Sequence, residues 1–190
     1  MAQLVLASGS AYRKALLERL GVPFVAIAPQ VDETARSGEA PAETALRLSI
    51  LKAKALAERG DFIIGSDQVA SCGGRRFGKP GNHENAARQL RELSGQTVEF
   101  HTGLALLDSK NDSVQTRVVL CRVTFRTLDE RRIQAYLEKE KPFDCAGAAK
   151  AEGLGIALVA RIETDDPTSL IGLPLIALSE MLERAGIQLL

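Results

Sequence analysis

The chain has 190 residues, of which 24 are Lys or Arg and 24 are Asp or Glu, so its formal net charge is zero. This balance argues against a protein that binds nucleic acid polymers, because such proteins usually carry a basic excess. Hydrophobic residues make up 45% of the chain and charged residues 25%, which is typical of a folded globular protein and excludes a disordered one. The length predicts a single domain over residues 1–190.

Apolar runs and helical spacings alternate along the first half of the chain. Each strand is predicted from a short apolar run, and most helices from apolar residues three or four positions apart. The predicted strands are Gln3–Ala7, Phe24–Ala28 and Phe62–Gly65, and the predicted helices are Ala11–Leu20, one from Pro41 that Gly60 closes, and one from Asn82 to Leu93. Phe62–Gly65 carries Ser66-Asp67-Gln68 at its C-terminal end, and Val69–Cys72 leads to a hairpin turn at Gly73-Gly74.

The second half of the chain begins with a long hairpin. Its predicted elements are strands at Thr97–Leu107 and Val114–Phe125, a helix at Leu128–Glu138, a strand at Ile156–Val159 and a helix at Pro174–Ala185. Alternating helices and strands followed by an inserted hairpin predict an α/β fold with a mixed sheet.

Three cysteines, Cys72, Cys121 and Cys145, lie far apart and form no Cys-x-x-Cys pair. This spacing predicts reduced thiols, and neither a disulfide framework nor a structural zinc site. Reduced thiols favour a cytoplasmic location. The first apolar run, Gln3–Ala7, is too short for a signal peptide or a membrane span, so we expect no membrane association.

The first junction between a strand and a helix combines hydroxyl groups, a glycine and basic residues. Ser8 and Ser10 flank Gly9, and Arg13 follows in the first helical turn. Backbone N–H groups and the helix dipole favour an anion at such a place, so the pattern is that of a phosphate cradle, although it lacks the spacing of a Walker A loop. The alternative is an ordinary helix cap with solvated basic residues.

Acidic and basic residues recur at later junctions. Asp67 follows a buried strand, where it either caps a turn or does chemistry. Glu33 lies in a polar loop, Lys52 interrupts a helix near its apolar stripe, and Lys79 lies between a glycine and a proline. Each could be an ordinary solvated charge. As a set they suggest acids that hold a divalent cation and bases that neutralise phosphates.

Together these segments resemble the Maf family of nucleoside triphosphate pyrophosphatases. The resemblance follows the chain in order and covers nearly all of it. It rests on Ser8-x-Ser10-x-x-Arg13-Lys14-x-x-Leu17, Val31-Asp32-Glu33, Lys52-Ala53, Gly65-Ser66-Asp67-Gln68-Val69, Gly78-Lys79-Pro80, Thr102-Gly103, Cys145-Ala146-Gly147, Glu152-Gly153-x-Gly155 and Ile171-Gly172-Leu173-Pro174.

The resemblance implies hydrolysis of a nucleoside triphosphate between the α and β phosphates, with a divalent cation, Mg²⁺ or Mn²⁺, as cofactor. The implied fold is Maf/ITPase-like, an elongated mixed β-sheet with flanking helices and two lobes around a deep cleft, commonly assembled as a homodimer. The family's proton acceptor matches Asp67. The residues that line its phosphate and metal site match Ser8, Arg13, Glu33, Lys52 and Lys79.

These roles agree with the chemistry of the side chains. Arg13 offers a bidentate fork to phosphate, and Lys52 and Lys79 act as point charges. Glu33 and Asp67 are oxygen ligands that suit Mg²⁺ or Mn²⁺, and one of the two can accept the proton of the attacking water. The sequence leaves open which carboxylate is the base, and we favour Asp67.

Three positions depart from the commoner family pattern. Tyr12 stands in place of an arginine, Gln68 in place of a threonine, and Glu152 in place of a glutamine. This combination resembles the branch that acts on 7-methyl-GTP. The methylated ring is cationic and gains from an aromatic face, and a carboxylate can accept from the N–H donors of guanine. The alternative for Tyr12 is core packing, and for Glu152 a solvated side chain.

Other functions compete with this hypothesis. The chain could act on dTTP or UTP, as another branch of the family does. It could instead be a nucleotide-binding regulator of cell division whose hydrolysis is incidental. A structural partner protein without a site would require the junctions at Ser8, Asp67 and Lys79 to be coincidental, because independent site features rarely converge on one chemistry.

Overall fold

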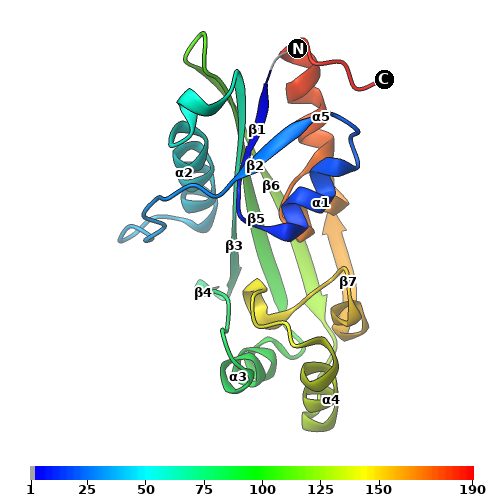
Figure 1. Cartoon of the computed structure of the whole chain (residues 1–190). Coiled ribbons are helices and arrows are strands. Elements are labelled where there is room, and N and C mark those ends of the chain that lie inside the picture. The colour runs from blue at the N-terminus through cyan, green and yellow to red at the C-terminus, as the bar shows by residue number, and fades with distance from the viewer. Residues whose placement is uncertain (1–2) are drawn as a thin grey trace. The chain divides into compact units, whose positions relative to one another are not determined.

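The structure is a computed structural model that describes residues 3–190. Within that range seven strands form one mixed sheet in the order β2-β1-β3-β5-β6-β7, and β4 pairs with β3 (Figure 1). The α/β class with a mixed sheet is confirmed. The strands are β1 (Leu4–Ala7), β2 (Phe24–Ile27), β3 (Phe62–Cys72), β4 (Arg75–Phe77), β5 (Thr97–Asp108), β6 (Ser113–Phe125) and β7 (Val159–Thr164). The helices are α1 (Ala11–Glu18), α2 (Pro41–Lys54), α3 (His83–Leu93), α4 (Glu130–Glu140) and α5 (Leu175–Arg184), with 3₁₀ turns at Ala57–Arg59, Ala146–Ala148, Leu154–Leu158 and Pro167–Ile171.

The chain divides into two compact units. The first contains the chain up to Gln68 together with His101–Val119 and Asp166–Leu190, and the second contains Val69–Phe100 and Leu120–Asp165. Strands β3, β5 and β6 contribute residues to both units. None of the helices between residues 3 and 190 is long and apolar enough to cross a bilayer.

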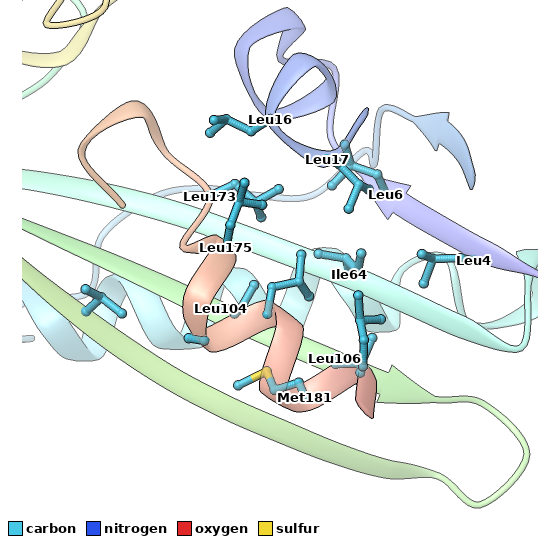
Figure 2. Packing of buried hydrophobic residues seen from close by; sticks show 14 residues of the cluster. Leu4, Leu6, Leu16, Leu17, Ile64, Leu104, Leu106, Leu173, Leu175 and Met181 are labelled. Atoms are coloured by element: carbon cyan, nitrogen blue, oxygen red, sulfur yellow. The ribbon is translucent and has the colours of Figure 1, made fainter. Parts of the chain in front are cut away.

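The first unit has three layers because its strands are apolar on both faces. Side chains alternate between the faces of a strand, and β1 pairs in parallel with both β2 and β3. On one face α1 and α5 cover the sheet (Figure 1). Figure 2 shows the packed residues of that layer, which include Leu4, Leu6, Leu17, Ile64, Leu104 and Leu173.

Helix α2 covers the opposite face of the sheet in the first unit (Figure 1). The alternate residues of the same strands meet it there, and the cluster consists of Val5, Ala7, Ala53, Leu56, Ile63, Ala105 and Leu107. Consecutive residues of β3 therefore point to different helices. This alternation decides which neighbours each site residue contacts.

The second unit is built around α3, α4 and the turn at Ala146–Ala148, which pack together. Asn82 caps α3 as predicted, since its Oδ1 accepts from the N–H of Asn85 at 2.9 Å. Helix α4 begins two residues later than predicted, because Asp129 is its cap and accepts from Arg132 N at 2.7 Å.

Three other sequence predictions differ more substantially from the structure. The helix from Pro41 ends at Lys54 rather than at Gly60, and a 3₁₀ turn fills most of the interval. The strand predicted at Phe62–Gly65 continues to Cys72, so Ser66-Asp67-Gln68 lie within a strand and not after its end. The strand predicted at Ile156–Val159 is wrong: Leu154–Leu158 is a 3₁₀ turn, and β7 starts at Val159.

Candidate active site

The candidate site begins where two parallel strands lie side by side. Ala7, the last residue of β1, is the register partner of Gly65 in β3. Ser8 therefore leaves the sheet beside the segment of β3 that continues to Asp67. In α/β sheets the carboxyl ends of parallel strands are where ligands bind. The predicted site residues Ser8, which follows β1, and Asp67, which lies within β3, are thus neighbours in space.

The loop from Ser8 to Ser10 leads into α1 with its hydroxyl groups turned to the backbone. Ser8 Oγ accepts from Ser10 N at 3.1 Å, and Ser10 Oγ accepts from Arg13 N at 3.4 Å. Ser10 is therefore the N-cap of α1, as in the alternative interpretation of this segment, but the solvated basic residues of that alternative do not hold for Arg13, which is half-buried and bonded to Gly172 O. The phosphate cradle remains a prediction, and Tyr12 lies half-buried in the first turn of the same helix.

At the centre of the site one ammonium group lies between two carboxylates. Lys52 Nζ is 2.6 Å from Asp67 Oδ1 and 3.0 Å from Glu33 Oε1. The side chains of Lys52 and Asp67 are 7% and 10% exposed, while that of Glu33 is 57% exposed. A buried charge needs a partner. The alternative in which Lys52 is a solvated surface charge is therefore wrong.

Two glycines explain how α2 brings Lys52 so close to the sheet. A Cβ atom on Gly65 would lie 2.9 Å from Ala53 N and still closer to the carbonyl oxygen of Ser49. A Cβ on Gly103 would lie 2.8 Å from Leu46 N and closer again to Ala45. These positions leave room for the helix backbone only because they lack a side chain. Asp67 is two residues beyond Gly65, so it points to the same face and meets Lys52.

The loop that carries Glu33 is held to α2 by Arg47. The Arg47 guanidinium donates from Nη2 to Glu39 Oε2 at 2.8 Å and to the carbonyl oxygen of Thr34 at 3.2 Å. Thr34 is the residue after Glu33. The more exposed carboxylate of the site is thus anchored to α2 twice, through the backbone of its neighbour and through its own ion pair with Lys52.

Burial raises the pKa of Asp67 above its usual value, although the charges of Lys52 and Arg13 act in the opposite direction. The nearby charge of Glu33 contributes to the increase. A carboxylate with a raised pKa is a stronger base than an ordinary aspartate. Since Lys52 occupies Oδ1, the oxygen of Asp67 that is left for a water molecule is Oδ2.

Arg13 is fixed by the backbone of a distant loop. Its Nε donates to the carbonyl oxygen of Gly172 at 2.8 Å, and the hydroxyl of Ser66 donates to the same oxygen at 2.9 Å. Ser66 also contacts the carbonyl oxygen of Gly103 at 2.8 Å. Burial lowers the pKa of Arg13, and the charges of Asp67 and Glu33 offset part of that effect. The guanidinium is therefore held near enough for the charges of both carboxylates to act on it.

The side-chain amide of Gln68 is committed to the protein. Its Nε2 donates to Thr102 Oγ1 at 2.9 Å and to the carbonyl oxygen of Ser169 at 2.8 Å, and lies 3.2 Å from that of Leu170. Thr102 in turn donates to Ser169 O at 3.0 Å. Because all these partners act as acceptors, they define the orientation of the amide. Gln68 can therefore offer only its carbonyl oxygen to a substrate.

Two predicted residues, Lys79 and Glu152, belong to the second unit and are exposed. The loop that carries Lys79 is well anchored: Gly78 O accepts from Gln89 Nε2 at 3.1 Å, and Gly81 N donates to Phe143 O at 2.9 Å. The other predicted site residues all belong to the first unit. Of these, the structure brings Arg13, Glu33, Lys52 and Asp67 into one charged cluster.

The carboxylates of Glu33 and Asp67 fit a hard divalent cation only with help from the substrate. No group of three or more acidic, histidine or cysteine side chains that could hold a metal ion occurs within residues 3–190. Mg²⁺ usually binds through one or two carboxylates together with phosphate oxygens and water. Two carboxylates that share one ammonium group therefore suit a cation that arrives with a triphosphate.

Three residues of the site were missed by sequence reasoning: Ser66, Thr102 and Gly172. All three lie in motifs of the family resemblance, but nothing in those motifs indicates that the hydroxyls of Ser66 and Thr102 bind backbone carbonyls. The period of two along β3 would have placed Ser66 on the face opposite Asp67. The partner loop around Gly172 lies more than a hundred positions away, and local sequence gives no signal for that contact.

The chain is similar to several known proteins. The sequence pattern of one family, described as Maf-like protein, matches residues 3–185. A protein named 7-methyl-GTP pyrophosphatase from Thiobacillus denitrificans is 55% identical over 98% of this chain and 94% of its own length. Another of that name from Bordetella pertussis is 56% identical over 97% and 93%. A solved HAM1 protein from Coxiella burnetii has a TM-score of 0.46 and 19% identity, covering 66% of this chain and 73% of that one.

Proposed function

The chain belongs to the Maf family, and we propose that it hydrolyses 7-methyl-GTP between the α and β phosphates to 7-methyl-GMP and pyrophosphate. The names of relatives that are more than half identical over nearly the whole chain support this substrate. The observation that carries the chemistry is the Lys52 ammonium between two carboxylates, whose charges also act on the half-buried guanidinium of Arg13.

In the proposed reaction a water molecule attacks the α phosphorus. Asp67 Oδ2 accepts a proton from the water, the bond from the α phosphorus to the bridging oxygen breaks, and pyrophosphate leaves. Arg13 and Lys52 oppose the negative charge that develops on the phosphoryl oxygens. Lys79 is assigned to the phosphates as well. Ser8 and Ser10 lie at the N-terminus of α1, where a phosphate oxygen is favoured.

We assign the divalent cation to Glu33 and Asp67, with Mg²⁺ or Mn²⁺ as the metal. Such a cation supplies positive charge to the phosphates and orients them. The exposed Glu33 is the carboxylate that can turn toward an incoming metal–nucleotide complex, whereas Asp67 is fixed by Lys52. Glu33 is therefore proposed mainly as a ligand and Asp67 mainly as the base.

Recognition of the base is assigned to Tyr12, Gln68 and Glu152. A cationic 7-methylguanine gains from an aromatic face, by roughly 0.5–2 kcal/mol. Glu152 can accept from the N1–H and N2 donors of guanine. The carbonyl oxygen of Gln68 is an additional acceptor, because its amide N–H groups are bound to Thr102 and Ser169.

A panel of nucleotides tests the substrate. With Mg²⁺ or Mn²⁺ present, we expect kcat/KM for 7-methyl-GTP to exceed that for GTP, dTTP and UTP by at least about tenfold, because one well-placed recognition group contributes about 1–3 kcal/mol. Pyrophosphate release is the measurement. Faster turnover of dTTP or UTP would contradict the substrate and leave the reaction type intact. Undiminished turnover in excess EDTA would contradict the metal.

The raised pKa of Asp67 predicts the acid limb of the pH profile. A general base works only when ionised, so kcat/KM should be lost as the pH falls through the pKa of Asp67, which lies above the ordinary value of about 3.9. Because Lys52 lowers the pKa of Asp67, the residual activity of Lys52→Gln should show this limb at a still higher pH. An unmoved limb would assign the titration to the substrate phosphates instead.

We also propose that the protein is a cytoplasmic homodimer. The family resemblance supports the dimer. Cys72, Cys121 and Cys145 are thiols rather than members of disulfides, which supports a reducing compartment. Burial raises the pKa of Cys121 to about 11, so this thiol is not a nucleophile at neutral pH.

A further inference from the structure

The segment that presents Glu152 is a tight loop whose backbone hydrogen bonds converge on Lys150. The carbonyl oxygen of Lys150 accepts from the N–H groups of both Gly153 and Gly155 at 3.0 Å. The N–H of Lys150 donates to the hydroxyl of Tyr136, a buried residue of α4, at 3.1 Å. The loop over residues 150–155 is therefore anchored to α4 at its start.

A second side chain of α4, Glu140, holds both ends of the same loop. Its Oε1 lies 2.9 Å from Lys150 Nζ, and its Oε2 accepts from Leu154 N at 2.6 Å. The Glu140 side chain is only 11% exposed, and its hydrogen bonds to Lys150 and Leu154 hold its pKa below the usual value. One ionised carboxylate thus spans the segment on which Glu152 lies.

Gly153 shows how closely this carboxylate fits the loop. A Cβ atom at position 153 would lie 2.6 Å from Glu140 Oε2 and 2.9 Å from Oε1. Any other residue here would push the carboxylate away from Lys150 and Leu154. The close approach accounts for the glycine next to Glu152, since the backbone of Gly153 is not in the left-handed region.

We propose that Glu140 is a positioning residue for base recognition: by bridging Lys150 and Leu154, it fixes the backbone from which Glu152 reaches the base of the nucleotide. The Glu152 side chain is exposed and can adopt many rotamers. A fixed backbone limits where its carboxylate can go and so lowers the entropy lost on binding. This inference rests on the proposed function.

The test is Glu140→Gln, which keeps the shape of the side chain but turns an N–H donor toward either Lys150 or Leu154. We expect KM for 7-methyl-GTP to rise by about tenfold with a much smaller change in kcat. The base is recognised equally in the ground state and the transition state, so losing that recognition weakens binding without slowing the chemical step. The inhibition constant of inorganic tripolyphosphate, which has no base, should change by less than about twofold. Hydrogen exchange at residues 150–155 should accelerate.

Two further variants decide whether Glu140 acts through Glu152. In a Glu152→Gln background, Glu140→Gln should raise KM no further, since coupled residues are not additive. Glu138→Gln, on the same helix and exposed, should leave KM unchanged. Equal losses for 7-methyl-GTP and tripolyphosphate, or additive effects of the two variants, would overturn the proposal.

The failure of this inference is distinct from a failure of the proposed function. If Glu152→Gln weakens 7-methyl-GTP while Glu140→Gln does not, only the positioning role is wrong. If the wild-type enzyme does not prefer 7-methyl-GTP in the nucleotide panel, the proposed function fails and the role in base recognition fails with it. If Glu140→Gln lowers the melting temperature substantially, Lys150→Met, which removes only the ammonium partner, must reproduce the selective change in KM.

Discussion

Asp67→Asn should lower kcat for 7-methyl-GTP by about 10³-fold, within the range of about 10²–10⁴ that a positioned general base contributes. The amide keeps the shape of the side chain and can still accept a hydrogen bond from Lys52, but it cannot take a proton from water. Binding of the nucleotide should persist, because Arg13 and Lys79 are unaffected. Single-turnover hydrolysis and equilibrium binding of 7-methyl-GTP are the measurements.

Glu33→Gln is the matched comparison, since Glu33 is the other carboxylate bound to Lys52. Its loss should raise the concentration of Mg²⁺ needed for activity and lower kcat less than Asp67→Asn does. If Asp67→Asn retained kcat within tenfold while Glu33→Gln abolished it, the roles of base and metal ligand would have to be exchanged. Thermal melting of both variants shows whether either loss reflects unfolding.

The sequence was most informative where local rules act alone. Helix α3 starts after its Asn82 cap as expected, and the hairpin of β5 and β6 was placed to within a residue at each end. Prediction failed where tertiary contacts override the local pattern. The apolar run at Ile156–Val159 suggests a strand. Instead, Ile156 N donates to Gly153 O at 3.3 Å and Val159 N donates to Ile156 O, so most of this run forms a 3₁₀ turn.

The candidate site, like the fold, was predicted only in part. Family resemblance identified Lys52 and Asp67, and the structure shows them in one buried ion pair. No pattern in the sequence indicates that the amide of Gln68 is bound to Thr102 and Ser169, or that Glu140 holds the loop of Glu152. Such contacts join residues brought together only by the fold, so periodicity and spacing carry no information about them.

Gly65→Ala should impair folding and catalysis together, because the added Cβ would lie 2.9 Å from Ala53 N and closer still to Ser49 O. Both contacts are backbone atoms of α2, so the helix as a whole must move away from β3. Overpacking of this kind costs about 3 kcal/mol, which corresponds to a fall in melting temperature of roughly 6–12 °C for a chain of this size. Displacement of Lys52 from Asp67 should lower kcat by about 100-fold.

A substitution at a second glycine distinguishes the effect on stability from the effect on kcat. Gly103→Ala would contact α2 at Ala45, two turns from Lys52 rather than one, so it should destabilise the fold similarly but lower kcat less. Gly78→Ala is the control for stability, because a Cβ at position 78 meets no heavy atom of residues 3–190 within 4 Å. If Gly65→Ala left both the melting temperature and kcat unchanged, close contact between α2 and β3 could not be what brings Lys52 to Asp67.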